Sequence, residues 1–232
     1  MNCRCTIVIP TLNERDNMVP LLSRIEAAGI PGCHILVVDE NSPDGTLEAV
    51  RAYAAGKPHI RGITNDGIPG LGPSIVKGFS LADSDILCCM DGDLQHDVSN
   101  LKGLIEAAET HDLVIGSRYV SGGGFAERWN PVRVIISRTA AWLARLVLGV
   151  RVNDPMSGFF AVRREAFMAI RPQLDPRGFK IMLEILYLLT RKGNYRITEY
   201  GITFGKRLHG QSKLSARVML QYLKMLVALR RR

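Results

Sequence analysis

Long apolar runs are missing from this 232-residue sequence. No stretch reaches the roughly 18 uninterrupted apolar residues of a bilayer-spanning helix, so we expect no such helix. The best candidate, residues 134–150, is broken by Arg138 and Arg145. The five cysteines lack the paired spacing of zinc ligands, which argues against zinc or disulfide roles and favours a reducing cytosol.

Aromatic residues are scarce, at 6% of the chain, and acidic residues are scarce in the second half. Residues 1–117 hold 8 basic and 16 acidic residues, whereas residues 118–232 hold 22 basic and 6 acidic ones. This imbalance predicts an anionic partner for the second half, which could be nucleic acid, a membrane or a phosphorylated substrate. Because the chain has no recognition motif or aromatic platform for bases, we expect no nucleic-acid partner.

Strand-like apolar runs alternate with helical segments through the first 117 residues. The runs span residues 6–10, 34–39, 59–64, 85–90 and 112–116, and most of them are continuous, which is typical of strands buried on both faces. The pattern predicts an α/β fold with a mostly parallel, Rossmann-like sheet and helices on both faces. In such a sheet the carboxyl ends of the strands share one edge, where ligands bind.

Carboxylates follow two of the predicted strands at this edge. Asp39 ends the second strand, and Asp91 and Asp93, separated by a glycine, follow the fourth. Two such aspartates can turn toward one hard cation, Mg²⁺ or Mn²⁺, which usually also binds substrate phosphates. A lone D-x-D pair can equally cap a turn, but its place at the ligand edge favours a metal site.

Several motifs resemble those of inverting family-2 glycosyltransferases, which have the GT-A fold. Two nucleotide-sugar loops and a metal motif carry this resemblance: residues 6–14, residues 37–46, and DGDLQH at 91–96. Four further segments resemble polyprenol-phosphate (dolichol-phosphate) mannose synthases: SRY at 117–119, DPMSGFF at 154–160, GFK at 178–180 and GQSK at 210–213.

The resemblance implies transfer of mannose from GDP-mannose to a polyprenyl phosphate with inversion. It implies that a pocket for the base and ribose, and contacts with the nucleotide sugar, are formed by Pro10, Leu12, Glu14, Asp39, Asn41 and Asp91. It also implies Mg²⁺ or Mn²⁺ held by Asp91, Asp93 and Gln95. A UDP-sugar donor, with undecaprenyl phosphate as acceptor, stays open as the alternative.

A phosphate acceptor is an anion near neutral pH, so it needs no base, but it needs cations beside an anionic donor. The resemblance implies Arg118, Arg133 and Ser137 as its ligands, and we add Lys206 and Arg207. Arg133 and Ser137 lie four residues apart in a predicted helix, hence on one face. The expected catalytic residues are Asp91, Asp93, Arg118 and Arg133. We expect Asp154 either to contact the sugar or to hold an arginine.

The expected domain is a GT-A domain over residues 1–211, with a nucleotide-sugar half at 1–117 and an acceptor half at 118–211. Residues 212–232 interleave leucines with basic residues. This segment is expected to be an amphipathic helix, either lying on an anionic membrane or packed as an ordinary helix. We expect a cytoplasmic protein, peripheral on the cytoplasmic face of a membrane.

Overall fold

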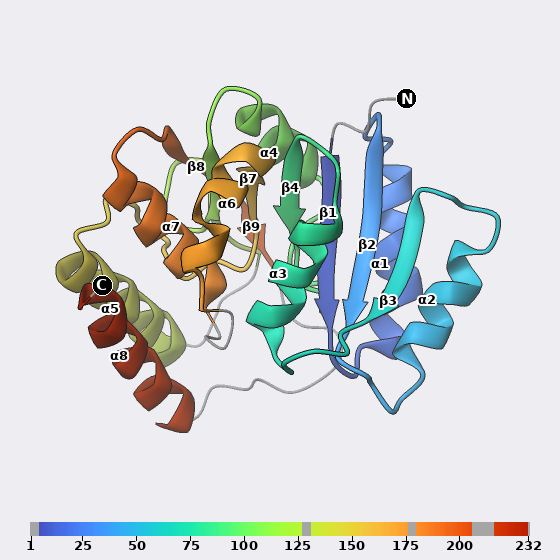
Figure 1. Ribbon diagram of the computed structural model, residues 1–232, viewed down its shortest axis with the longest axis horizontal. Helices are drawn as coiled ribbons and strands as arrows, with labels where there is room; N and C mark the ends of the chain where they lie inside the picture. Colours follow the sequence, from blue (N-terminus) through green and yellow to red (C-terminus); the bar gives the residue numbers. More distant parts are fainter. Residues whose placement is uncertain (1–4, 127–130, 176–179, 206–215, 232) are drawn as a thin grey trace.

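A seven-stranded sheet forms the centre of the computed structural model, which describes residues 5–126, 131–175, 180–205 and 216–231, with only the backbone for 131–133 and 216–218. The strand order is β3-β2-β1-β4-β7-β5-β8 (Figure 1). The strands are β1 (Cys5–Thr11), β2 (Cys33–Asp39), β3 (Ile60–Thr64), β4 (Ile86–Cys89), β5 (Leu113–Ser117), β7 (Phe160–Arg163) and β8 (Ile197–Gly201).

The sheet is mostly parallel, as predicted. Strand β1 pairs in parallel with β2 and β4, β2 pairs in parallel with β3, and β5 with β8. Strand β7 is the exception, because it lies antiparallel between β4 and β5. Its insertion carries the segment that precedes it, residues 154–159, to the carboxyl ends of β4 and β5.

Helices cover both faces of the sheet, which confirms the predicted fold class. Ile7 and Ile9 of β1 belong to a core shared with α1 (Arg15–Ala27), α2 (Thr46–Ala54) and α4 (Asn100–Ala108). Val8 between them points to the opposite face. Its core is shared with α3 (Leu71–Leu81), α5 (Pro131–Leu148), α6 (Arg164–Ile170), α7 (Ile181–Lys192) and α8 (Ala216–Arg230).

Residues 197–204 form two strands of different sheets. Strand β8 ends at Gly201, and a separate β9 (Thr203–Phe204) pairs with β6 (Gly124–Phe125). The loop at residues 121–123 crosses Gly201 so closely that an added Cβ would lie 2.4 Å from Ser121 O. Helix α6 and the short 3₁₀ helix Arg171–Gln173 were not predicted.

Helix α8 packs beside α5 at the end of the molecule where β8 forms the sheet edge (Figure 1). Tyr222 Oη donates a 2.6 Å hydrogen bond to Ala140 O, and Leu226 and Leu229 are buried. Among the described helices, none combines the length and apolarity needed to cross a bilayer. The domain boundary expected at residue 211 falls outside the described residues, so that division stays a prediction.

Candidate active site

Three loops leave the carboxyl ends of β1, β2 and β4 along one edge of the sheet, the lower edge in Figure 1. Each holds a non-glycine residue in the left-handed backbone region: φ is 58° at Asn13, 59° at Asn41 and 62° at Leu94. Asparagine tolerates this region, whereas a bulky leucine is strained there. Such strain gathers at ligand-binding sites, so the sheet edge predicted from the sequence is the candidate site.

Asp39 ends β2 and is only 1% exposed. Its carboxylate accepts hydrogen bonds from Thr11 Oγ1 (2.8 Å) and from the backbone N–H (2.7 Å) and Oγ (2.7 Å) of Ser42. A carboxylate has about four acceptor positions, so the protein itself uses most of those on Asp39. Asp39 therefore joins the ends of two neighbouring strands, and its contact with a nucleotide stays a prediction.

The other residues predicted for the nucleotide pocket lie on the same edge. Pro10 is buried in β1, Leu12 and Glu14 are half-buried in the next loop, and Asn41 is exposed. The Glu14 carboxylate accepts a 2.6 Å hydrogen bond from Asn17 Nδ2 in α1. The parallel register of β1 and β2 brings these residues together, although none of them lines the cavity beside β4. Their roles toward a nucleotide sugar stay predictions.

The loop after β4 carries the two aspartates expected to bind a metal. Asp93 is 5% exposed, and its Oδ1 accepts a 3.1 Å hydrogen bond from the backbone N–H of Gln95. The Gln95 side chain donates through Nε2 to Gly205 O at 3.2 Å. Asp91 is half-buried, and its Oδ2 lies 3.2 Å from Nε2 of His96. One short loop thus gathers two carboxylates, an amide and an imidazole.

His96, the last residue of the DGDLQH motif, is a further site residue. Its ring packs against Phe159 and Phe204, with ring centroids 4.9 and 5.0 Å away. Its Nδ1 is buried and has no hydrogen-bond partner among the described residues. Because the two aromatic rings hold the imidazole in place, Nε2 stays directed at Asp91 and orients that carboxylate.

The donor atoms of this loop suit a hard divalent cation, because Mg²⁺ and Mn²⁺ prefer carboxylate and amide oxygens. The Gln95 amide oxygen has no hydrogen-bond partner in the described chain and is available to an ion. Over residues 5–126, 131–175, 180–205 and 216–231, no group of three or more His, Cys, Asp or Glu side chains could hold an ion. An ion held by Asp91, Asp93 and Gln95 would therefore need further ligands from water or a substrate, and this ligand set stays a prediction.

A cavity of about 170 Å³ opens beside Asp91. Two cations line it: Arg118, which follows β5, and Lys180, which precedes α7. The segment before β7 supplies another wall through Met156 and Gly158. The cavity therefore places one candidate metal-binding carboxylate and two positive charges around one space, which suits a ligand with several phosphate oxygens.

Lys180 belongs to the GFK motif, but sequence reasoning assigned it no role. Its Nζ donates to Met156 O at 3.4 Å. Burial lowers the pKa of its ammonium group; the charges of Asp91 and Asp154 oppose this effect, and that of Arg118 adds to it. The signal that could have identified Lys180 is a lone lysine directly before a nine-residue buried helical run.

Arg118 and Asp154 form a bidentate ion pair. Arg118 Nε donates to Asp154 Oδ2 at 2.7 Å, and Nη2 donates to Oδ1 at 2.8 Å. The Asp154 side chain is fully buried and that of Arg118 is 12% exposed. Burial works against the charge on Arg118, but the hydrogen bonds and charge of Asp154 outweigh it and raise the pKa of the guanidinium. Of the two roles left open for Asp154, the structure supports holding an arginine.

Glu199 in β8 supports this pair from behind. Its carboxylate accepts hydrogen bonds from the backbone N–H (2.7 Å) and Nδ2 (2.8 Å) of Asn153 and from the backbone N–H of Asp154 (2.9 Å). Glu199 therefore fixes the turn that carries Asp154, and through it the orientation of Arg118.

Part of the predicted acceptor site is described. Ser137 lies on α5, and its Oγ accepts a 3.0 Å hydrogen bond from Tyr119 Oη, so α5 is tied to the residue after Arg118. Arg133 falls within α5, one turn before Ser137, as predicted, but its side chain lies outside the described residues. Lys206 and Arg207 lie wholly outside them.

Gly158 allows Asp91 its observed position, because a Cβ at Gly158 would lie 2.5 Å from Asp91 Oδ2. We expect Gly158→Ala to displace this carboxylate and to lower kcat about 10²-fold, since an ångström of misplacement has such an effect. The midpoint of thermal unfolding should change little. Gly67→Ala, where the added Cβ meets no atom closer than 3.6 Å, is the matched control. Equal turnover by the two variants would contradict the proposed importance of this carboxylate.

The model of the family "Glycosyl transferase family 2" matches residues 6–171. A dolichol-phosphate mannosyltransferase of Pyrococcus furiosus is 40% identical, over 95% of this chain and 62% of its own length. A protein of the same name from Saccharomyces cerevisiae is 36% identical, over 97% of this chain and 86% of its own length. The chain thus spans less than two thirds of the Pyrococcus relative.

Solved structures share the fold at low sequence identity. The glucosyl-3-phosphoglycerate synthase of Mycobacterium tuberculosis, in complex with Mn²⁺, UDP and phosphoglyceric acid, superposes with a TM-score of 0.74. It is 19% identical, over 98% of this chain and 78% of that one. A mannosyltransferase of Pyrobaculum calidifontis in complex with GDP-Man and Mn²⁺ gives a TM-score of 0.69 at 16% identity, over 97% and 64% of the two chains. These likenesses show the GT-A fold.

Sheet topology, family match and relatives therefore agree with the motifs at the sheet edge. The chain belongs to glycosyl transferase family 2 and, within it, to the polyprenyl-phosphate mannosyltransferases.

Proposed function

We propose that this chain transfers mannose from GDP-mannose to a polyprenyl phosphate with inversion at the anomeric carbon. The observation that carries the proposal is the cavity in which Asp91 faces Arg118 and Lys180. The names of the relatives support mannose as the sugar and a polyprenyl phosphate as the acceptor. GDP-Man bound to a protein of the same fold supports the choice of donor.

The reaction needs no general base from the protein. An acceptor phosphate oxygen is already anionic near neutral pH and attacks the anomeric carbon, while the bond from that carbon to the diphosphate oxygen breaks. GDP leaves on the opposite side, so the configuration inverts. Arg118 and Lys180 line the cavity, and their charge would offset the repulsion between the acceptor phosphate and the donor diphosphate.

Mg²⁺ or Mn²⁺ would be held by Asp91, Asp93 and Gln95. When bound, the ion would neutralise charge on the leaving nucleotide. Mn²⁺ in the two solved structures of this fold supports a divalent ion here. The part of His96 is to keep the Asp91 carboxylate turned toward the site, through the 3.2 Å contact with Nε2.

The proposed location is the cytoplasmic face of a membrane, where a lipid-linked acceptor resides. The described part of α8 leaves Leu220, Leu223 and Val227 exposed beside Lys224 and Arg230. Such a mixture of apolar and basic side chains suits the interface of an anionic bilayer. Free cysteines at positions 33, 88 and 89 suit a reducing compartment.

A panel of donors and acceptors tests the activity. GDP-mannose, UDP-glucose and UDP-mannose are each offered with dolichyl or undecaprenyl phosphate, in Mg²⁺, in Mn²⁺ and in a chelator. We expect transfer from GDP-mannose with metal and its loss in chelator. Transfer only from a UDP-sugar would replace the proposed donor, and no transfer from any donor would reject the proposed function.

Arg133→Ala should raise the KM for the acceptor at least about tenfold and the KM for GDP-mannose by less than about twofold, because one charge-assisted contact to phosphate is lost. The comparison variant is Arg51→Ala, on α2, which is exposed and lies outside the acceptor half. Initial rates at varied donor and acceptor concentrations give both constants. Equal increases in the two would remove Arg133 from the acceptor site.

A further inference from the structure

A second cavity, of about 540 Å³, lies between α5 and the loop at residues 118–125. It shares only Arg118 with the cavity beside Asp91. Its lining includes Tyr119, Arg138, Arg145 and Asn153, and none of its lining residues is acidic. Helices α5 and α8 contain no aspartate or glutamate. Two carboxylates lie behind the lining, Asp154 on Arg118 and Glu199 on Asn153. The positive charge of this second cavity therefore comes from Arg138 and Arg145.

The guanidinium of Arg145 has a buried hydrogen-bond donor, its Nε. No described residue accepts a hydrogen bond from this nitrogen. A buried donor of a charged group without a partner is costly, so the native environment of such a group normally supplies an acceptor. Arg145 also lines the second cavity, so an anion in that space would lie beside this arginine.

Arg138 provides a second guanidinium at the same cavity. It lies two helical turns before Arg145 on α5, and its guanidinium carbon stands 5.6 Å from the centre of the Tyr119 ring. Arg118, the third arginine of the lining, is already paired with Asp154. Arg138 and Arg145 thus offer planar forks that bind phosphate bidentately.

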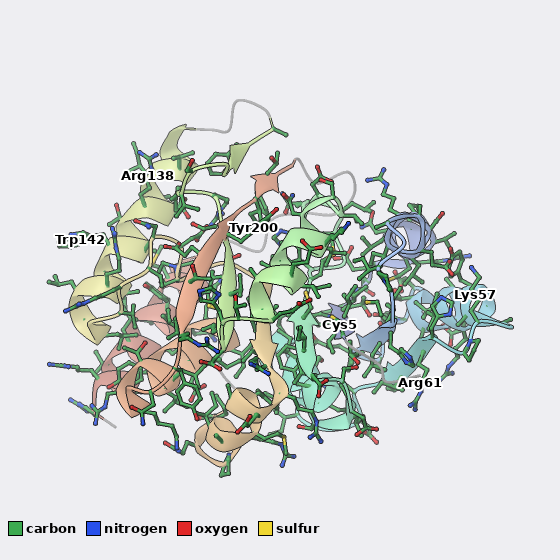
Figure 2. All side chains as sticks on the ribbon, turned by 90° about the horizontal axis from the view of Figure 1, so that it is seen from above. Cys5, Lys57, Arg61, Arg138, Trp142 and Tyr200 are labelled. Carbon is green, nitrogen blue, oxygen red and sulfur yellow. The ribbon has the colours of Figure 1, made fainter. Side chains whose placement is uncertain are left out.

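The same helix exposes a row of large apolar side chains next to these arginines. Ile135, Trp142 and Leu146 are 63%, 54% and 64% exposed. Figure 2 shows Arg138 and Trp142 on the outer side of α5, at the opposite end of the molecule from Arg61. Basic residues beside exposed tryptophan and aliphatic residues match the boundary between lipid headgroups and acyl chains.

We propose that the second cavity binds the phosphate headgroup of an anionic membrane phospholipid, with Arg138 and Arg145 as its ligands and Trp142 entering the acyl boundary. This inference rests on the proposed membrane location. The phospholipid is neither substrate nor product, and its binding would hold α5, and with it Ser137, at the membrane surface where the acceptor lies.

Vesicle binding tests the site with variants that keep the charge. Co-sedimentation is measured with phosphatidylcholine vesicles and with vesicles of 70% phosphatidylcholine and 30% phosphatidylglycerol. We expect the double variant Arg138→Lys/Arg145→Lys to bind the anionic vesicles about tenfold more weakly than the wild type, because bidentate contacts are lost while charge is retained. Arg61→Lys, an exposed arginine of β3 at the far end, should bind as the wild type does.

Equal binding of the double variant and the wild type would overturn the site in favour of diffuse attraction. Inorganic phosphate at constant ionic strength separates the two sources of phosphate. If it displaces the protein from anionic vesicles at millimolar concentration, a free anion, not a lipid, is the ligand. Thermal unfolding shows whether each variant is folded. If the double variant is unfolded, Arg138→Lys alone, at an exposed position, replaces it in the vesicle assay.

Transfer to a short-chain acceptor in detergent, without vesicles, separates this proposal from the proposed function. The double variant should transfer mannose there as fast as the wild type. If the wild type transfers no mannose in this assay, the proposed function is rejected. The vesicle assay then decides the phospholipid site by itself. Slow transfer by the double variant in detergent would instead place these arginines at the acceptor and overturn the phospholipid site.

Discussion

Asp91→Ala and Asp93→Ala are each expected to lower kcat about 10²–10³-fold while the protein stays folded, because charge that stabilises the transition state is lost. Asp91 is half-buried beside the cavity, and its Oδ2 contacts His96 at 3.2 Å. Asp93 is more deeply buried and fixes the backbone of Gln95. The two variants therefore remove different supports of the same candidate ion site.

Steady-state rates over a range of Mn²⁺ concentrations measure the effect, with thermal unfolding as the check on folding. The midpoint should fall more in Asp93→Ala than in Asp91→Ala, since Asp93 is the more deeply buried of the two and accepts a backbone hydrogen bond from Gln95. Asp83→Asn, at an exposed position outside the site, is the control for loss of an acidic charge. Full activity in both Asp91→Ala and Asp93→Ala would contradict the proposed mechanism.

Asp154→Ala is expected to lower the free energy of unfolding by about 3–5 kcal/mol, the usual cost of leaving one charge of a buried pair unpaired. Asp154 is completely buried and holds the mostly buried Arg118 through two hydrogen bonds of 2.7 and 2.8 Å. The variant should also lose acceptor binding, because Arg118 is no longer directed toward the cavity. Denaturant unfolding and the acceptor KM measure the two effects.

A second substitution separates stability from function. Arg118→Met in the Asp154→Ala background removes the unpaired charge, so it should restore much of the stability but none of the transfer activity. The matched control is Asp66→Ala, which breaks an exposed ion pair with Lys77 and should leave stability almost unchanged. An Asp154→Ala protein as stable as the wild type would show that this pair does not hold the loop.

The sheet and its ligand edge were predictable because their signals are local. Continuous apolar runs mark the strands β1, β2, β4 and β5, and the helical patterns between the strands require parallel neighbours with helices on both faces. Asp39, Asp91 and Asp93 directly follow such runs, so their place at the carboxyl edge follows from chain direction alone.

Pairing between distant segments was not predictable, and it decided the shape of the site. The sequence does not indicate that β7 runs antiparallel between β4 and β5, since that arrangement depends on residues tens of positions apart. That insertion carries Asp154 to Arg118 and Gly158 to Asp91. Lys180 was missed for the same reason, because only the folded chain brings it to the cavity.

The sequence by itself determined the fold class, the ligand edge and the kind of chemistry, since apolar periodicity and short motifs act within a few residues of each other. Only the tertiary structure decided which charges meet. It joined Arg118 to Asp154, filled most acceptor positions of the Asp39 carboxylate with hydrogen bonds from the protein, and left the buried Nε of Arg145 without an acceptor among the described residues. The physical reason is that hydrogen bonds and ion pairs are short-ranged, so a charge acquires its role from its neighbours in space.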